Sequence, residues 1–247
     1  MLGMPRRNAD PDGASDAVAL TLSARRVGRA LAACVIGIHL LNLPAVVFRH
    51  LWPSRLGEAY AAFFGVSSEG RLPTFYSGVT LLGAAMLLGI IAVHARRGGD
   101  LFARHWAGLA AIFVLMAADE MLVIHELSIG PIRRLLGITS GPLLFAWVVP
   151  ALAFVAAFGG VYLRFVLALP ARSRNLIVLA GLVYVGGALG LELASGLYVG
   201  ARGHDLGYGV LSTIEEVAEM CGIAVLLYAL VDYLARGVSQ VRVTFRN

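Results

Sequence analysis

Four side chains that can bind a metal ion or a proton stand close together in one apolar segment. The segment AADEMLVIHEL, residues 117–127, contains Asp119, Glu120, His125 and Glu126. Ionisable groups inside a membrane segment are costly, and by default they indicate a functional site. Carboxylates with one or two imidazoles suit Mn, Fe or Zn, and they can also relay protons. The segment therefore predicts a cation or proton site.

Two later apolar segments contain further acids, which raise the number of carboxylates to seven. Glu192 lies in one of these segments, and Glu215, Glu216 and Glu219 lie in the first turns of the other. Because consecutive spans alternate in direction, a rise of about 1.5 Å per residue places all seven acids in the same third of the bilayer. His39 in the first apolar segment falls at a comparable depth. We therefore expect three helices, and a fourth through His39, to converge on one site.

These acids have no basic partner in the middle of any span. The chain contains no Lys, and none of its 20 Arg residues falls mid-span. A central Asp costs about 2.5–3.5 kcal/mol on insertion scales, so seven unpaired acids cost on the order of 10 kcal/mol. Protons, water or a bound cation must compensate for that cost.

Helical periodicity divides the candidates into ligands and supporting residues. On a continuous helix, Asp119 and Glu126 lie within about 20° of each other, whereas Glu120 and His125 lie on opposite flanks. Only one of Glu120 and His125 is then expected to face the site. The predicted ligands are Asp119, Glu126, Glu192, Glu215 and Glu219. The residues expected behind these ligands or at the rim are His39, Glu120, His125 and Glu216.

A divalent metal site, mononuclear or binuclear, is the first interpretation of this pattern. Helical bundles build Fe and Mn sites from Glu and His on facing helices. A redox-active metal here could oxidise a lipid-soluble or periplasmic substrate, whereas Zn would favour hydrolysis by an activated water molecule. The chain lacks a Glu-x-x-His motif, and the HEL of residues 125–127 lacks the second His of a His-Glu-x-x-His protease. The sequence therefore predicts Fe, Mn or Zn without selecting a reaction.

Three alternatives remain open beside the metal site. The acids could be proton or cation relays of a transporter, although inverted repeats would place acids at opposite ends of the third and sixth spans. A bis-His haem could use His39 and His125, or His94 and His105, but haem does not require the acids, so it is the less favoured cofactor. In the last alternative the acids are protonated and only pack helices or dock another subunit. Asp232 and Arg236 are predicted to form an i,i+4 ion pair.

The composition predicts an integral membrane protein. The 247 residues are 59% hydrophobic and 14% charged, and their mean hydropathy is +0.80. A soluble domain is typically about 25% charged. The net charge of +5 is then a sign of Arg facing anionic lipid and does not indicate nucleic-acid binding.

The fold class predicted is an all-α polytopic membrane protein with six transmembrane helices and a short interfacial amphipathic helix. The apolar runs are long enough to cross a core of about 30 Å. The amphipathic helix follows Trp52 and has Leu56, Tyr60, Phe63 and Phe64 at helical spacing. The predicted spans are 27–48, 73–94, 105–127, 142–167, 175–198 and 212–235. The predicted parts of the chain are a disordered tail at 1–26, the membrane domain at 27–235 and a second tail at 236–247.

The distribution of Arg predicts how the chain is oriented. With the N-terminus inside, 14 of the 20 Arg residues fall on the cytoplasmic side, although Arg133 and Arg134 do not. Basic residues concentrate in cytoplasmic loops. We therefore expect a multi-pass protein of the inner membrane with both termini cytoplasmic and the acids near the outer face. The expected partners are the lipid bilayer and either a second copy or a partner membrane subunit, with no nucleic acid.

The fifth span is rich in small residues, which let membrane helices approach closely. They include Gly181, Gly186, Gly187, Gly190, Ser195 and Gly196. We expect this span in the interior of the bundle, with Glu192 facing the site.

Overall fold

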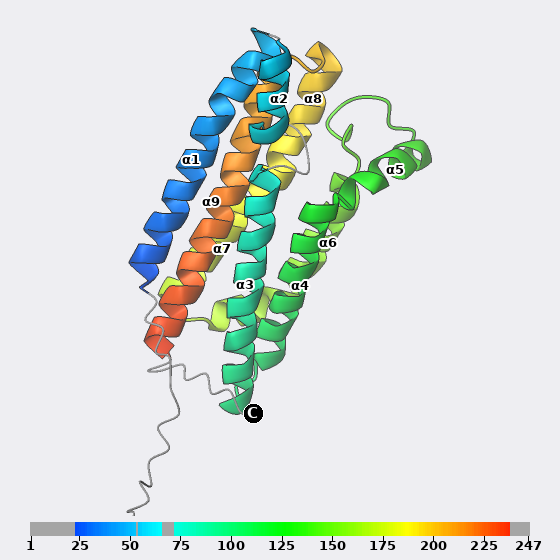
Figure 1. Cartoon of the computed structure of the whole chain (residues 1–247). Helices are drawn as coiled ribbons and strands as arrows, with labels where there is room; N and C mark the ends of the chain where they lie inside the picture. The colour runs from blue at the N-terminus through cyan, green and yellow to red at the C-terminus, as the bar shows by residue number, and fades with distance from the viewer. Residues whose placement is uncertain (1–22, 53, 66–71, 238–247) are drawn as a thin grey trace, which may run out of the picture.

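The computed structural model describes residues 23–52, 54–65 and 72–237, and the described elements are all helical (Figure 1). The first half contains α1 (Ala24–His50), α2 (Arg55–Phe64), α3 (Leu72–Arg97), α4 (Ala103–Leu122), a 3-10 turn η1 (His125–Ser128) and α5 (Ile129–Leu136). The second half contains α6 (Val148–Ala168), α7 (Ala171–Val185), a π-helical segment η2 (Gly186–Leu191), α8 (Glu192–Arg202) and α9 (Leu206–Gly237).

Within the described residues, six helices are long and apolar enough to cross a membrane, as predicted. They are α1, α3, α4, α6, the continuous run α7–η2–α8 and α9. The all-α polytopic class is confirmed. The division into tails and membrane domain remains a prediction, because residues 1–22 and 238–247 lie outside the described part of the chain.

The ends of the spans differ from prediction in two places that matter for the site. The third span was predicted to reach residue 127, but α4 ends at Leu122. The fourth was predicted to begin at residue 142, but α6 begins at Val148, after an irregular stretch. Both differences lie at the upper end of Figure 1, beside α5 and α8.

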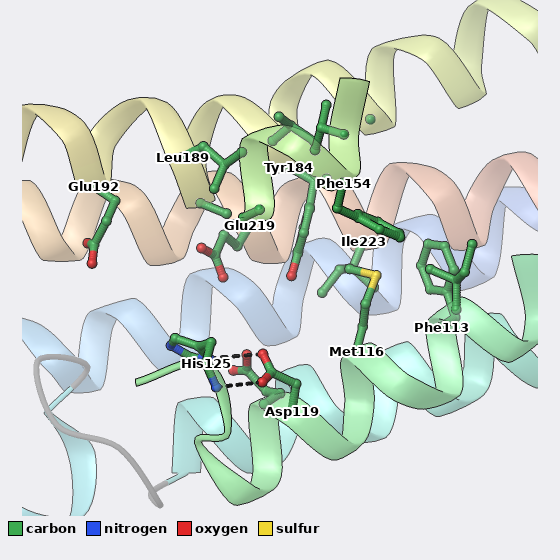
Figure 2. Close-up of a pocket in the computed structure, with 18 of the residues that line it drawn as sticks. Phe113, Met116, Asp119, His125, Phe154, Tyr184, Leu189, Glu192, Glu219 and Ile223 are labelled. Carbon is green, nitrogen blue, oxygen red and sulfur yellow. Dashed lines mark hydrogen bonds and ion pairs between the residues drawn. The ribbon is translucent and has the colours of Figure 1, made fainter. Parts of the chain in front are cut away.

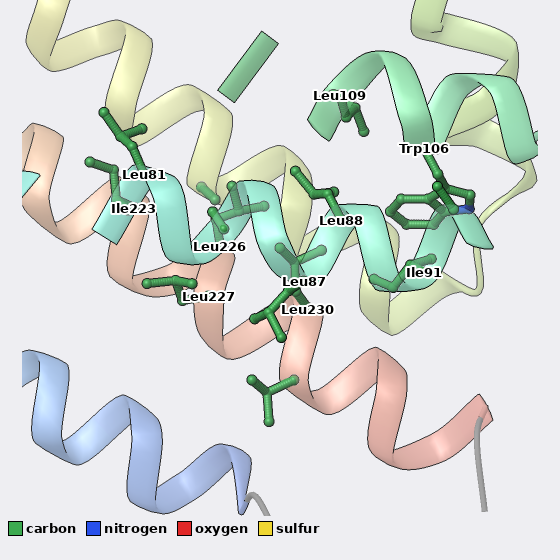
Figure 3. Close-up of a cluster of buried hydrophobic side chains, with 14 of the residues drawn as sticks. Leu81, Leu87, Leu88, Ile91, Trp106, Leu109, Ile223, Leu226, Leu227 and Leu230 are labelled. Atoms are coloured by element: carbon green, nitrogen blue, oxygen red, sulfur yellow. The ribbon is translucent and has the colours of Figure 1, made fainter. Parts of the chain in front are cut away.

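Helix α9 lies at the centre of the bundle and packs against α1, α3 and α7. Its core contacts are large aliphatic side chains that share one buried cluster with those of α3, and Figure 3 shows Ile223 beside Leu81 and Leu230 beside Leu87. Helices α3 and α4 form a close antiparallel hairpin beside it. This packing fixes α4, α7 and α9 relative to one another.

The lower ends of α4 and α6 are joined by aromatic rings. The Phe165 ring lies 4.8 Å from Trp106 and stacks on His105 at 5.5 Å. The Tyr162 hydroxyl donates to the His105 carbonyl at 3.3 Å. This contact holds the lower end of α6 against α4.

The predicted amphipathic helix is present as α2, which folds back along the upper part of α1. The Ser54 hydroxyl caps it by accepting the Gly57 N–H at 3.0 Å. The Tyr60 hydroxyl donates to the Leu41 carbonyl at 3.0 Å, and its ring meets Phe48 edge-on. Leu56 remains exposed.

Asp232 forms the predicted pair with Arg236, and a second arginine joins it from another helix. Arg236 Nε donates to Asp232 Oδ2 at 2.9 Å. Arg172 of α7 donates to both Asp232 oxygens, at 3.0 and 3.4 Å, and to the Tyr228 hydroxyl at 3.1 Å. The cluster ties the lower ends of α7 and α9 together. Spacing along one helix predicted Arg236 but gave no sign of Arg172.

Candidate functional site

A cavity of about 850 Å³ lies between α4, α6, α9 and the α7–η2–α8 span. Its volume falls in the range of small-molecule sites, about 300–1,000 Å³. Seven acids and one histidine line one end, which we call the acid end: Asp119, Glu120, His125, Glu126, Glu192, Glu215, Glu216 and Glu219. Eight of the nine predicted site residues therefore line one cavity.

The acid end contains much of the negative charge of the chain. Seven of its 15 Asp and Glu residues are there, and no Arg is among the described residues that line the cavity. The side chains are half-buried, apart from the exposed Glu126. Uncompensated charge in a partly dry cavity requires protons or cations.

The end of α4 explains how all four residues of the opening motif reach the cavity. The helix stops at Leu122, and Val123 turns the chain with φ 54° in the left-handed region. His125 then folds back over the helix end, where Asp119 accepts its backbone N–H at 2.8 Å and hydrogen-bonds its ring Nδ1 at 2.9 Å (Figure 2). The prediction that only one of Glu120 and His125 would face the site was wrong, since both line the cavity. That prediction assumed a continuous helix through residue 127.

Val123 is the only non-glycine residue with positive φ in the described part of the chain. A β-branched residue is strained in that region, and such strain persists only where the surroundings enforce it. Here the hydrogen bonds of both Asp119 oxygens to His125 hold Val123 in this conformation. The strained turn therefore fixes the position of the imidazole ring.

Glu192 is positioned by a tryptophan and by the π-helical segment that ends immediately before it. Trp147 Nε1 donates to Glu192 Oε1 at 3.0 Å, and the Trp147 ring lies 4.7 Å from the ring of His125. The Glu192 carboxyl also hydrogen-bonds with that of Glu215. Two carboxyl groups in contact must share a proton or a cation. π-helical segments often occur at functional sites.

The acids of α9 are positioned by a close approach to η2. A Cβ added to Gly187 would lie 2.9 Å from Ala218 Cβ and 3.2 Å from the Glu215 carbonyl oxygen. This contact confirms the role predicted for small residues at Gly187. At Gly181, by contrast, an added Cβ would meet nothing within 4 Å. The η2 contact aligns Glu215 and Glu219 with Glu192.

His39 does not line the cavity, unlike the other predicted residues. The flanking residues Val35 and Ile38 pack against Met220 of α9, so α9 separates α1 from the cavity. The His39 Nδ1 hydrogen-bonds with the Val35 carbonyl at 2.9 Å. The depth estimate for His39 could not reveal which side of α9 it would occupy.

Several lining residues were not predicted from the sequence. Trp147 and Tyr184 lie among the acids, and Figure 2 shows Tyr184 and Glu219 projecting into the cavity from neighbouring helices. Ser128, Tyr208 and Ser212 also line it. The sequence did contain a signal for Tyr184. Ile177, Tyr184 and Glu192 are spaced about two helical turns apart, which indicates that Tyr184 shares a helix face with Glu192.

The described residues contain no group of three or more His, Cys, Asp or Glu side chains arranged to hold a metal ion. The predicted ligand set therefore remains a prediction.

A family model matches residues 28–233, which include the six spans almost completely and all residues of the cavity. The chain belongs to this family, DUF8692, a domain of unknown function. No curated protein matches the chain. No solved structure matches it either.

Proposed function

We propose that this DUF8692 protein binds a divalent cation at the acid end of its cavity and acts as a membrane metalloenzyme. The observation that supports this proposal is the concentration of seven carboxylates in a lining whose described residues include no Arg. A divalent cation such as Mn, Fe or Zn would neutralise part of this charge. The Arg distribution supports an inner-membrane orientation with both termini cytoplasmic and the acid end outward.

The hydrogen bond between Asp119 and His125 suggests a role for each residue. Histidines that bind metals usually donate their other ring N–H to a carboxylate, which fixes the ring orientation. With Nδ1 bonded to Asp119, His125 would bind the cation through Nε2. In this proposal Asp119, first predicted to be a ligand, becomes a positioning residue, and His125 becomes a ligand.

The remaining ligands would be Glu126, Glu192, Glu215 and Glu219. Glu192 and Glu215 are already in contact, and a cation between two carboxylates removes the need for a shared proton. Binding would require these side chains to turn toward one point, which the open cavity allows. A cation held there would supply Lewis-acid or redox chemistry.

Elemental analysis of protein purified without chelator tests the proposal. The wild type should retain a transition metal in stoichiometric amount, and the double variant Glu192→Gln/Glu219→Gln should lose it while remaining folded in detergent. Glu58→Gln is the matched control, because Glu58 is an exposed acid of α2 away from the cavity. Metal-free wild type, or equal metal in the double variant, would refute the proposal.

Proton-coupled transport is the second candidate, and the contact between the Glu192 and Glu215 carboxyls favours it. A pair that shares a proton can release and regain it during transport. Protein in liposomes would then show a pH-gradient-dependent flux that Glu215→Gln abolishes, with no bound metal. A stoichiometric metal together with no flux would exclude this second candidate.

A further inference from the structure

The cavity continues far beyond the acids as an apolar channel between the helices. Along α4 its lining runs from Asp119 back to Trp106, which is 13 residues or about 20 Å. This exceeds half of a hydrocarbon core of about 30 Å. At the lower end the lining includes Trp106, whose ring lies 4.8 Å from that of Phe165. The cavity is therefore an elongated pocket with one polar end and one apolar end.

Helices α4 and α9 show the same change from polar to apolar along the cavity. The α4 lining runs from Glu120 through Met116, Phe113 and Leu109 to Trp106, and the α9 lining runs from Glu215 through Glu219, Ile223 and Leu226 to Leu230. Figure 2 shows Phe113 and Met116 beyond the acids on the same side of the cavity. Because separate helices change from polar to apolar in the same direction, the whole cavity has a polar end and an apolar end.

We propose that this cavity binds a single-chain amphiphile, with its apolar chain along α4, α7 and α9 and its head group among the acids. The proposal rests on the proposed function, because the head group is then the part on which the metal acts. An apolar channel in a six-span protein would be filled from the bilayer, and Gly181, which lines it, is exposed. The seven acids repel an anion, so the head group carries no negative charge in the absence of metal.

The tryptophans provide a direct measurement of where the chain lies. Of the three in the sequence, Trp106 and Trp147 line the cavity, and the exposed Trp52 can be replaced by phenylalanine. Trp106 is 1% exposed, so a quencher dissolved in the surrounding lipid does not reach it. A dodecanol brominated at the end of its chain would quench Trp106 only from inside the cavity.

The experiment uses Trp52→Phe/Trp147→Phe protein, whose one remaining tryptophan is Trp106, in saturated phosphatidylcholine nanodiscs with chelator present. We expect saturable quenching by the brominated dodecanol. Gly181→Phe should weaken the apparent affinity at least about tenfold, because the new ring would occupy open space inside the channel. Gly160→Phe on α6 is the matched control, since its Cβ also meets nothing within 4 Å but it does not line the cavity. The corresponding brominated dodecyl phosphate should bind at least about tenfold more weakly than the alcohol.

Three results would overturn the inference. These are non-saturable quenching in the protein with Trp106 alone, equal affinity after adding Gly181→Phe or Gly160→Phe, and equal affinity for the phosphate and the alcohol. Because the measurement is made without metal, it can succeed when elemental analysis finds no metal, and it can fail when metal is present. The two proposals therefore fail separately.

Discussion

Acidic residues of the spans occur in two contrasting environments at opposite ends of the bundle. At the lower end, Asp232 is 8% exposed and accepts hydrogen bonds from Arg172 and Arg236. At the acid end, seven carboxylates line a cavity whose described lining includes no Arg. Arginines balance the charge of Asp232, whereas seven acids share the described lining of the cavity with one histidine, His125, which pairs with Asp119.

This difference separates acids that stabilise the fold from acids that the fold accommodates at a cost. A paired acid removed from a buried cluster leaves its partners without compensation. Removing one acid from a crowded group of acids relieves repulsion and desolvation. Proteins accept such costs at sites that act on ligands. Neutralising substitutions should therefore lower the stability of the fold at the lower end and raise it at the acid end.

The largest stability effect is expected at the lower end. Asp232→Ala removes three hydrogen bonds from arginines and the link between α7 and α9. Since both arginines are more than half exposed, water replaces part of the lost interaction, and we expect a loss of about 2 kcal/mol. Unfolding in detergent measures it, with Glu58→Gln as control. An unchanged midpoint would mean that the cluster does not stabilise the fold.

The second effect concerns the pair of Asp119 and His125. Asp119→Asn keeps the shape of the side chain but removes the charge that orients the imidazole, so metal affinity should fall by about tenfold. The pH dependence of metal binding should also change, because the imidazole loses its carboxylate partner. Metal titration at several pH values measures both. If affinity falls but the pH profile does not move, Asp119 holds only the backbone of the turn.

The third effect is a gain of stability, opposite in sign to the loss expected for Asp232→Ala. In metal-free protein, Glu219→Gln replaces one of seven crowded carboxyl groups by an amide at nearly constant volume, and we expect stabilisation of about 1 kcal/mol. The same detergent unfolding assay measures the change. Destabilisation comparable to that of Asp232→Ala would place the seven acids among the residues that hold the fold together.

The fold was predictable because its signals are local. Length and hydropathy define six spans, and α1, α3 and α9 begin and end within a few residues of prediction or extend beyond it. The convergence of seven acids also followed from depth alone, since alternating spans fix which end each residue approaches. Depth and spacing along single helices were therefore sufficient for most of the candidate site.

The geometry within the site was not predictable, because it depends on irregular backbone without a sequence signal. Helix α4 ends at a left-handed Val123 where glycine or asparagine would normally indicate a stop. The glycines of the segment before Glu192 predict close packing of helices, but they do not indicate a π-helix. The positions of Arg172 and His39 depend on which face of α9 each helix covers, and periodicity along one helix does not determine that.

The smallest effect is expected at Asp205, an acid in the loop before α9 that is satisfied by neutral donors. Its Oδ1 accepts the Tyr198 hydroxyl at 2.8 Å and the Gly207 N–H at 2.9 Å, and these hydrogen bonds cap α9 beside the cavity residue Tyr208. The Tyr198 hydrogen bond is the main cause that lowers the pKa of Asp205 below its usual value.

A lowered pKa means that the stabilisation by Asp205 is present above the pKa of the unfolded chain and is lost as pH falls through the pKa of the folded protein. The unfolding midpoint of wild type should therefore fall slightly more than that of Asp205→Asn between about pH 5 and 3, where an unperturbed Asp titrates near 3.9. Identical falls would show that Asp205 contributes no pH-dependent stability, and the contrast would then lie only between Asp232, whose charge arginines balance, and the acids of the cavity.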